Sequence, residues 1–274
     1  MTAHRLRAVI FDVDGTLAET ERDGHRRAFN LAFRDHGLPY EWGVDEYGEL
    51  LAVTGGRRRL AGYLAERGVP HPDGLAQVLH RTKTAYYTDW LRDGPVVARP
   101  GVPELLARLR EGGVRLAVAT TGRRQWVTVL LDRLFPGTAF AAVVTGDDVT
   151  RLKPHPEVYD RALRELRIEA QDAVAVEDSP PGLAAATAAG LSCLVVTSAY
   201  HRDMSFPGAA AVVPGYLPRD MVDGGARPRT GRPDGAFAAG VTVDALRGMH
   251  AHAHHPSRPC NPRHPASPYG TSGA

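Results

Sequence analysis

Two aspartates near the start of the sequence, Asp12 and Asp14, have the type and spacing that catalysis requires. They follow the apolar run 8–11 and precede Gly15, whose backbone permits a sharp turn. Two carboxylates held near one point at the end of a strand can bind a hard cation. Asp12 is placed to attack phosphorus as a nucleophile, while Asp14 can donate a proton to the leaving group and later take one from water. The pair therefore predicts phosphoryl transfer.

The same spacing of aspartates also occurs in calcium-binding loops. Such a loop needs glycine at its sixth position and glutamate at its twelfth, where this sequence has Leu17 and Asp23. The context therefore favours phosphoryl transfer over calcium binding.

The composition indicates a globular protein without a membrane anchor. The chain has 274 residues, of which 43% are hydrophobic, enough for two compact units with a buried core. No apolar stretch approaches the roughly 18 residues of a membrane span, and no apolar signal stretch precedes the first strand. We therefore expect a cytoplasmic protein with no membrane partner. The net charge of +2 does not call for a nucleic-acid partner either.

Lysine and cysteine are both rare in this sequence. Of its 33 lysines and arginines, only Lys83 and Lys153 are lysines, and a compact ammonium suits contact with a phosphate. For either position alone, chance remains the alternative. The two cysteines, Cys193 and Cys260, offer no disulfide framework and no metal-ligand spacing, and Cys193 is expected to be a buried core thiol.

From residue 98 onward, short apolar runs alternate with helix-like segments. The runs lie at 115–119, 140–144, 173–176 and 192–196, and the polar residues that follow them lie at 120–121, 145–148, 177–179 and 197–198. This alternation is typical of βαβ units and predicts an α/β fold with a doubly wound parallel sheet. Because ligands bind at the carboxyl ends of such strands, the polar ends should converge on Asp12 and Asp14.

Residues 20–95 have helical rather than strand periodicity, which predicts a helical domain inserted after the first strand. The predicted units are a core of residues 1–17 and 96–250, a helical cap or lid of residues 18–95, and a disordered tail of residues 251–274. We also expect linkers near 18–21 and 93–100, a loop over 207–235, and a last helix over 241–251.

Four motifs occur in a fixed order along the chain: the Asp12 and Asp14 pair, Thr120, Lys153, and the acidic pair Glu177 and Asp178. In this the sequence resembles the haloacid dehalogenase superfamily of phosphotransferases over about residues 5–200. The segments 12–21, 23–26, 54–56, 144–149 and 197–200 are similar to the CbbY group of sugar-bisphosphate phosphatases. They separate the chain from the related β-phosphoglucomutases.

The resemblance implies roles for these residues. Mg²⁺ would be held by the Asp12 carboxylate, the Asp14 backbone carbonyl and Asp178, with Glu177 as a further acidic group. Thr120 would hydrogen-bond a phosphoryl oxygen, and Lys153 would neutralise the phosphoryl group and steady Asp12. The residues alone leave other interpretations open. Thr120 also suits an ordinary strand, Lys153 a protein surface, and Asp178 a helix N-cap.

Substrate selection is expected in the cap and at nearby strand ends. The substrate-binding candidates are Glu19, His25, Arg26, Tyr47, Thr54, Gly55, Arg57, Lys83, Thr121 and Arg123. Three of them, Arg57, Lys83 and Arg123, could bind a second phosphate. Each candidate could also be solvated surface.

Two segments depart from the usual pattern of the family. Gly122 and Arg123 follow Thr121 where another threonine or serine is usual. Pro180 and Pro181 stand in a segment that usually carries an asparagine, so a side-chain amide and a backbone N–H are lost near the metal.

The resemblance implies a Mg²⁺-dependent phosphatase that acts through an aspartyl-phosphate on Asp12. Its expected partner is a small sugar phosphate, with xylulose-1,5-bisphosphate as the substrate that the CbbY group suggests, and the chain is expected to be a monomer. The alternatives are a β-phosphoglucomutase-like enzyme, a non-catalytic sugar-phosphate sensor, and a haloacid dehalogenase proper. Accumulation of free phosphate distinguishes a phosphatase from a mutase.

Overall fold

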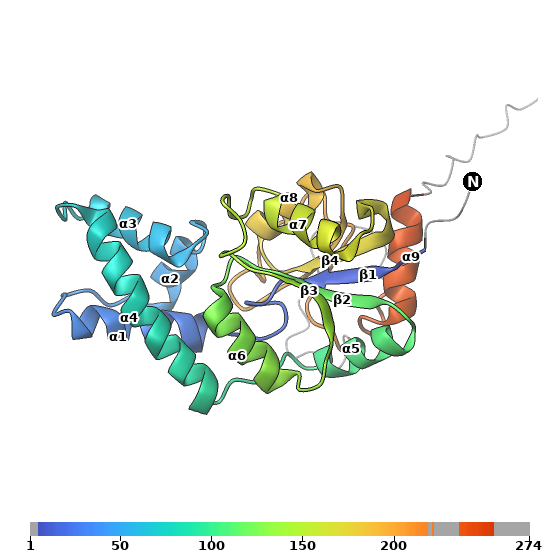
Figure 1. Ribbon diagram of the computed structural model, residues 1–274, viewed down its shortest axis with the longest axis horizontal. Helices are drawn as coiled ribbons and strands as arrows, with labels where there is room; N and C mark the ends of the chain where they lie inside the picture. The colour runs from blue at the N-terminus through green and yellow to red at the C-terminus, as the bar shows by residue number, and fades with distance from the viewer. Residues whose placement is uncertain (1–4, 219–220, 222–235, 255–274) are drawn as a thin grey trace, which may run out of the picture.

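A parallel sheet of six strands forms the centre of the computed structural model, which describes residues 5–218, 221 and 236–254 (Figure 1). The strands are β1 (Ala8–Phe11), β2 (Arg115–Ala119), β3 (Phe140–Val144), β4 (Ala173–Glu177), β5 (Ser192–Val196) and β6 (Ala211–Val213), in the order β3-β2-β1-β4-β5-β6. Phe11 at the end of β1 lies opposite Val118 on one side and Val176 on the other. The strand order reverses between β1 and β4, which is where doubly wound sheets bind ligands.

Helices cover both faces of the sheet, as Figure 1 shows. They are α5 (Val102–Glu111), α6 (Arg124–Leu134), α7 (Glu157–Leu166), α8 (Pro180–Ala188) and α9 (Val243–His254), with a short 3₁₀ turn at Ala170–Asp172. Alternate residues of β1 point to opposite faces of the sheet. Val9 and Phe11 pack with α5, α6 and α9 on one face, and Ala8 and Ile10 pack with α7 and α8 on the other. The expected doubly wound α/β fold is confirmed.

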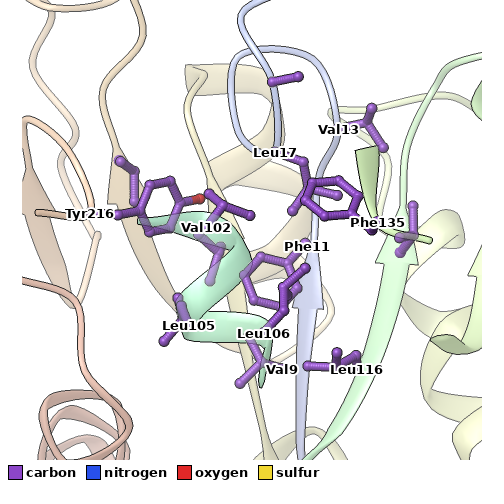
Figure 2. Close-up of a cluster of buried hydrophobic side chains, with 14 of the residues drawn as sticks. Val9, Phe11, Val13, Leu17, Val102, Leu105, Leu106, Leu116, Phe135 and Tyr216 are labelled. Carbon is purple, nitrogen blue, oxygen red and sulfur yellow. The ribbon is translucent and has the colours of Figure 1, made fainter. Parts of the chain in front are cut away.

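The turn that follows β1 rests on an apolar cluster (Figure 2). Phe11, Leu17 and the α5 residue Leu106 all belong to this cluster, and all three side chains are almost fully buried. Tyr216 closes the cluster, and its hydroxyl donates a hydrogen bond to the Thr16 carbonyl at 3.1 Å. Burial of each such side chain is worth about 1.5–3 kcal/mol, so the turn has a firm apolar base.

The inserted segment forms a separate layer of helices at one end of the sheet (Figure 1). It consists of a π-helical turn (Glu21–His25), α1 (Arg26–Asp35), α2 (Val44–Leu50), α3 (Gly56–Glu66) and α4 (Pro72–Asp93). These helices enclose an apolar cluster of their own that includes Phe33, Trp42 and Leu60. The two chain connections to the core touch each other at an isolated bridge between Ala18 and Ala98. A helical insertion after the first strand is thus present, and the domain boundaries stay a prediction.

One side chain of the core reaches into the helical insertion. Tyr200, which follows β5, packs its ring 5.9 Å from that of Tyr47 on α2. The adjacent Gly48 leaves room for this contact, because a Cβ there would lie 2.9 Å from the Tyr200 ring. The ring of Tyr200 therefore belongs to the apolar cluster of the cap helices.

The sequence did not predict two details at the C-terminal end. Strand β6 (Ala211–Val213) lies in the stretch expected to be a loop, and its three residues are too few for a periodic pattern to reveal. Helix α9 spans Val243–His254 rather than 241–251, so it includes the first four residues of the predicted tail. The rest of that tail, with Cys260, lies outside the described residues. Cys193 is buried as expected, and no described helix is long and apolar enough to cross a membrane.

Candidate active site

Three neighbouring strands deliver polar residues to one point of the sheet edge. Asp12 follows β1, Thr120 follows β2 and Asp178 follows β4. They surround a cavity of about 80 Å³, a volume that suits one phosphoryl group. Its polar lining consists of Asp12, Asp14, Glu21, Thr54, Arg59, Thr120, Thr121, Lys153, Asp178, Ser179 and His201. The structure thus brings Asp12, Asp14, Thr120, Lys153 and Asp178 together.

Lys153 is buried between two carboxylates. Its Nζ lies 2.6 Å from Oδ1 of Asp12 and 2.6 Å from Oε1 of Glu177, and it donates to the Ala119 carbonyl at 2.8 Å. The hydroxyl of Tyr159 donates a second hydrogen bond to Glu177 Oε1 at 2.6 Å. The two carboxylates raise the pKa of Lys153 well above its ordinary value despite its burial. A fixed ammonium therefore stands beside Asp12.

Asp12, Glu177 and Asp178 form a group of oxygen donors whose ligand atoms all lie within 4.8 Å of one another. Burial raises the pKa of Asp12 well above its ordinary value, Lys153 opposes that shift, and the carboxylates of Glu177 and Asp178 add to it. A hard divalent cation would relieve this repulsion and keep Asp12 ionised. Glu177 is the least available of the three, because both of its oxygens already accept hydrogen bonds: Oε1 from Lys153 and Tyr159, and Oε2 from the N–H of Asp178 at 3.3 Å.

Asp178 is held by a contact that the sequence did not indicate. Nδ1 of His201 lies 3.0 Å from Asp178 Oδ2 and 3.0 Å from the Ser198 hydroxyl. The same oxygen lies close to Gly15, which has φ of +78° and where a Cβ would lie 2.1 Å from Asp178 Oδ2. Only glycine permits both this backbone conformation and this close approach.

Asp14 is linked to the cap by a chain of hydrogen bonds. Its Oδ1 accepts from the Thr20 hydroxyl and lies 3.1 Å from Nε2 of His25, whose Nδ1 is 2.5 Å from Nζ of Lys83. Since an ammonium can only donate, Nδ1 of His25 accepts and its Nε2–H donates to Asp14. This assignment requires a neutral imidazole, and burial together with Lys83 lowers the pKa of His25 well below its ordinary value.

The two ends of this chain have shifted pKa values. Burial raises the pKa of Asp14 to about 6, while the Thr20 hydrogen bond and the Lys83 charge limit the rise. Burial lowers the pKa of Lys83 to about 7, with Glu21 and Asp14 opposing it. A carboxyl group with a pKa near 6 can both donate and accept a proton near neutral pH.

A buried arginine fixes the turn that carries Asp14. The guanidinium of Arg99 donates to the carbonyls of Gly15, Val196 and Thr197, the last at 2.9 Å. Arg99 belongs to the second connection between cap and core, so one side chain ties that connection to the turn after β1 and to the end of β5. Glu19 lies at this joint, 3.6 Å from Arg99 Nε.

A larger cavity of about 970 Å³ adjoins the small one and is bounded by α3 and α4 of the cap and by core loops. Asp14, Glu21, Gly55, Arg59 and Thr121 line both cavities. Basic side chains dominate the rest of the polar lining: His25, Arg57, Arg58, His80, Arg81, Lys83, Arg123, Arg151 and His155. Such a surface suits an anionic group attached to the substrate.

The predicted substrate-binding residues fall into three groups. Thr54, Gly55 and Thr121 line the small cavity, and His25, Arg57, Lys83 and Arg123 line the large one. Glu19, Arg26 and Tyr47 line neither of the two cavities found among the described residues. Arg26 instead donates to the Trp42 carbonyl at 3.0 Å, and Tyr47 is fully buried. Lys83 is buried and bound to His25, and Arg123 pairs with Asp147 at 2.8 Å.

Both departures from the family pattern have a local explanation. Gly122 is required because a Cβ there would lie 2.1 Å from the Trp126 ring, and its N–H donates to Thr120 Oγ1 at 3.1 Å. The N-cap of α8 is Ser179, whose hydroxyl accepts from the N–H of Gly182, so Asp178 is not needed for capping. Pro180 and Pro181 begin the helix, where missing N–H groups cost little.

Comparison with known proteins gives a consistent answer. Residues 6–190 match the haloacid dehalogenase-like hydrolase family. The chain is 44% identical over 208 residues to the protein CbbY of Cereibacter sphaeroides, covering 74% of this chain and 90% of that protein. The chain belongs to the haloacid dehalogenase-like hydrolase family. Within the family it is a CbbY-like protein, as the motifs of the sequence predicted.

Two further relatives indicate the type of reaction. A validoxylamine A 7′-phosphate phosphatase of Streptomyces hygroscopicus subsp. limoneus is 34% identical, with 72% of this chain and 88% of that protein aligned. A crystal structure of a CbbY variant from Rhodobacter sphaeroides, in complex with xylulose-1,5-bisphosphate, matches with a TM-score of 0.71 and 41% identity, covering 77% of this chain and 94% of that one. This CbbY-like protein is therefore a phosphatase, a hydrolase of phosphoric monoesters.

Proposed function

We propose that this protein hydrolyses a sugar bisphosphate, xylulose-1,5-bisphosphate, with Mg²⁺ and through an aspartyl-phosphate on Asp12. The observation that carries the proposal is the arrangement of Asp12, Lys153 and Asp14 around one small cavity. In this arrangement a nucleophile with its cation and a proton donor line the same cavity. The structure of the CbbY variant with xylulose-1,5-bisphosphate supports the choice of substrate.

Mg²⁺ fits the donor set. Asp12 and Asp178 offer hard carboxylate oxygens, and Gly15 leaves Asp178 close to the turn that carries the Asp14 carbonyl. We propose these three groups as the ligands, with Glu177 behind them as the partner of Lys153. When bound, Mg²⁺ would neutralise charge on the phosphoryl oxygens and shield Asp12 from the dianion that it attacks.

The residues of the chain supply the remaining steps. Asp12 attacks phosphorus, and the ester bond to the sugar oxygen breaks as Asp14 gives that oxygen its proton. Lys153 and the Thr120 hydroxyl, whose oxygen already accepts from Gly122, bind the phosphoryl oxygens. The ionised Asp14 then takes a proton from water, which attacks the phospho-Asp12 and releases phosphate.

We propose residues 18–95 as a cap that closes over the sugar. Cap and core each line both cavities, so a bound substrate would contact both units. Arg57 on the cap and Arg123 on the core line the large cavity, where the distal phosphate of a bisphosphate would lie. Closure would exclude bulk water while the phosphoryl group is transferred.

The test is phosphate release from xylulose-1,5-bisphosphate, ribulose-1,5-bisphosphate, β-glucose-1-phosphate and glucose-6-phosphate, with and without Mg²⁺. We expect rapid Mg²⁺-dependent release from xylulose-1,5-bisphosphate. Interconversion of the glucose phosphates with a bisphosphate primer, without net release, would instead identify a mutase. Release from all four at similar rates would contradict the proposed substrate while leaving the phosphatase activity intact.

Gly15→Ala should impair metal binding. The new Cβ would overlap Asp178 Oδ2 and the backbone would stay at an unfavourable φ, so Asp178 must move. We expect the Mg²⁺ concentration for half-maximal activity to rise by about 10- to 100-fold. The control is Gly43→Ala, because a Cβ at Gly43 meets nothing within 4 Å. An unchanged Mg²⁺ dependence in Gly15→Ala would argue against Asp178 as a ligand.

Lys83→Met should move the pH profile of the enzyme. Proton donation to the sugar oxygen needs the protonated form of Asp14, so kcat/KM should fall as pH rises through the Asp14 pKa, about 6. The Lys83 charge lowers that pKa, and its removal should shift the falling limb to higher pH. The measurement is kcat/KM for a sugar phosphate between pH 4.5 and 9. The shift should be absent with p-nitrophenyl phosphate, whose leaving group needs no proton; an equal shift with both substrates would contradict the role of Asp14.

A further inference from the structure

Glu21 occupies a position that the proposed mechanism does not use. It is one of the few residues that line both the phosphoryl cavity and the larger cavity, at the boundary between them. A carboxylate is unexpected there, because the surrounding side chains of the larger cavity are mainly basic. We propose that Glu21 selects phosphate esters of polyols by accepting a hydrogen bond from a substrate hydroxyl on the second or third carbon from the transferred phosphate. This inference rests on the proposed function.

One oxygen of Glu21 is fixed by the cap. The hydroxyl of Tyr47 donates to Glu21 Oε2 at 2.5 Å, and Arg59 Nη1 donates to the same hydroxyl at 3.2 Å. Arg59 is itself anchored by its Nε, which donates to the Leu50 carbonyl at 2.9 Å. Tyr47 is fully buried and Arg59 is 7% exposed, so the three residues form a rigid buried chain across the cap. Tyr47 is therefore a positioning residue for Glu21.

The other oxygen of Glu21 is open to a ligand. Among the described residues, Oε1 accepts no hydrogen bond, although the residue is partly buried. Its carboxylate lies within 4.8 Å of the ligand atoms of both Asp14 and His25. A hydroxyl on the second or third carbon from the ester oxygen would come to this region, because Asp14 must reach that ester oxygen. A carboxylate or second phosphate at the same place would be repelled.

Glu21 and His25 are the first and last residues of a π-helical turn, and both line the larger cavity. In this turn the N–H of His25 bonds to the Thr20 carbonyl at 2.8 Å, a reach of five residues instead of four. Gly24 makes the turn possible, because a Cβ there would lie 2.6 Å from the Trp90 ring. π-Helical turns occur frequently at functional sites, and this one presents two polar side chains to the ligand.

Glu19, and not Glu21, is among the substrate-binding candidates predicted from the sequence, and the structure separates the two. Glu19 lies at the joint between cap and core, 3.6 Å from Arg99, and lines neither cavity. Glu21 lines both. Substitution of Glu21 should therefore change the substrate preference, and substitution of Glu19 should not.

The experiment compares kcat/KM for xylulose-1,5-bisphosphate and for p-nitrophenyl phosphate, which has no hydroxyl to donate. Glu21→Ala should lower kcat/KM for the bisphosphate by about 10- to 100-fold and leave that for p-nitrophenyl phosphate within about 3-fold. Tyr47→Phe should have the same selectivity with a smaller loss, about 3- to 10-fold, because Glu21 stays but is less firmly held. Glu49→Ala is the matched control, since Glu49 is an exposed glutamate of the same cap. It should change neither value.

A third substrate tests the repulsive part of the inference. Phosphoglycolate carries a carboxylate where a polyol carries its hydroxyl, and Glu21→Gln should raise its kcat/KM relative to the bisphosphate by at least about 10-fold. The inference is overturned if Glu21→Ala lowers kcat/KM equally for xylulose-1,5-bisphosphate and p-nitrophenyl phosphate. It is also overturned if Glu19→Ala removes the preference for the bisphosphate and Glu21→Ala does not. If the wild type shows no preference for the bisphosphate over p-nitrophenyl phosphate, the proposed function fails instead. Retained p-nitrophenyl phosphate activity shows that each variant is folded.

Discussion

Replacing Asp12 by Asn should abolish phosphate release while the protein stays folded. An amide cannot attack phosphorus, so the aspartyl-phosphate cannot form. Loss of a nucleophile lowers kcat by about 10⁴-fold or more in hydrolases that form covalent intermediates. The shape of the side chain is kept, and the Asn oxygen can still accept a hydrogen bond from Lys153, which now lies 2.6 Å from Asp12. The measurement is phosphate release at saturating substrate and Mg²⁺.

The control for this variant is Asp45→Asn, which makes the same change at an exposed aspartate on α2. It should keep full activity. Asp12→Asn should still bind the substrate, which can be measured by calorimetry. Residual phosphate release above about 1% of the wild-type rate would show that Asp12 is not the nucleophile and that water attacks directly.

Replacing Lys153 by Met should be almost as damaging to turnover and should also destabilise the fold. Lys153 is the cation between the carboxylates of Asp12 and Glu177, and all three groups are buried. Removing one partner of a buried ion pair typically costs about 3–5 kcal/mol, because a charge is left uncompensated. We expect a similar loss of unfolding free energy in urea and a decrease in kcat of about 10³-fold or more.

Lys83→Met provides a sharp comparison, because it removes the only other lysine of the sequence from another buried position. Lys83 contacts a neutral imidazole rather than two carboxylates, and burial lowers its pKa to about 7. Its removal should therefore cost much less stability than removal of Lys153. Equal destabilisation by the two variants would mean that the packing of the lysine side chains, rather than the ion pairs, determines the effect. Lys153→Arg should be as inactive as Lys153→Met, since a planar guanidinium does not fit the position of an ammonium.

Much of the site follows from local sequence patterns. Asp12, Thr120 and Asp178 each follow an apolar run, and parallel strands must bring their carboxyl ends to one edge of the sheet. Strands β1 to β5 were predictable, because each is an apolar run bounded by polar residues, whereas the three-residue β6 was not. The order of the motifs along the chain then indicated the chemistry, and the family is confirmed by the comparisons.

The cap side of the site could not be predicted in the same way. Glu21, which lines both cavities, begins a π-helical turn, and hydrophobic periodicity does not distinguish such a turn from an α-helix. The contact of Lys83 with His25 joins residues 58 positions apart, and no local pattern encodes it. His201 reaches Asp178 only because of the path that the chain takes after β5. Such contacts depend on tertiary structure rather than on local sequence.

The packing of Tyr200 against Gly48 has a thermodynamic consequence for the proposed opening of the cap during turnover. Opening of the proposed cap would withdraw this partly buried ring from the apolar cluster of the cap helices and expose more of it to water. Hydration of apolar surface gives opening a positive heat-capacity change, so its enthalpy increases with temperature. Where release of product limits turnover, a plot of ln kcat against reciprocal temperature should be curved rather than straight. Replacing Tyr200 by a smaller residue should straighten it.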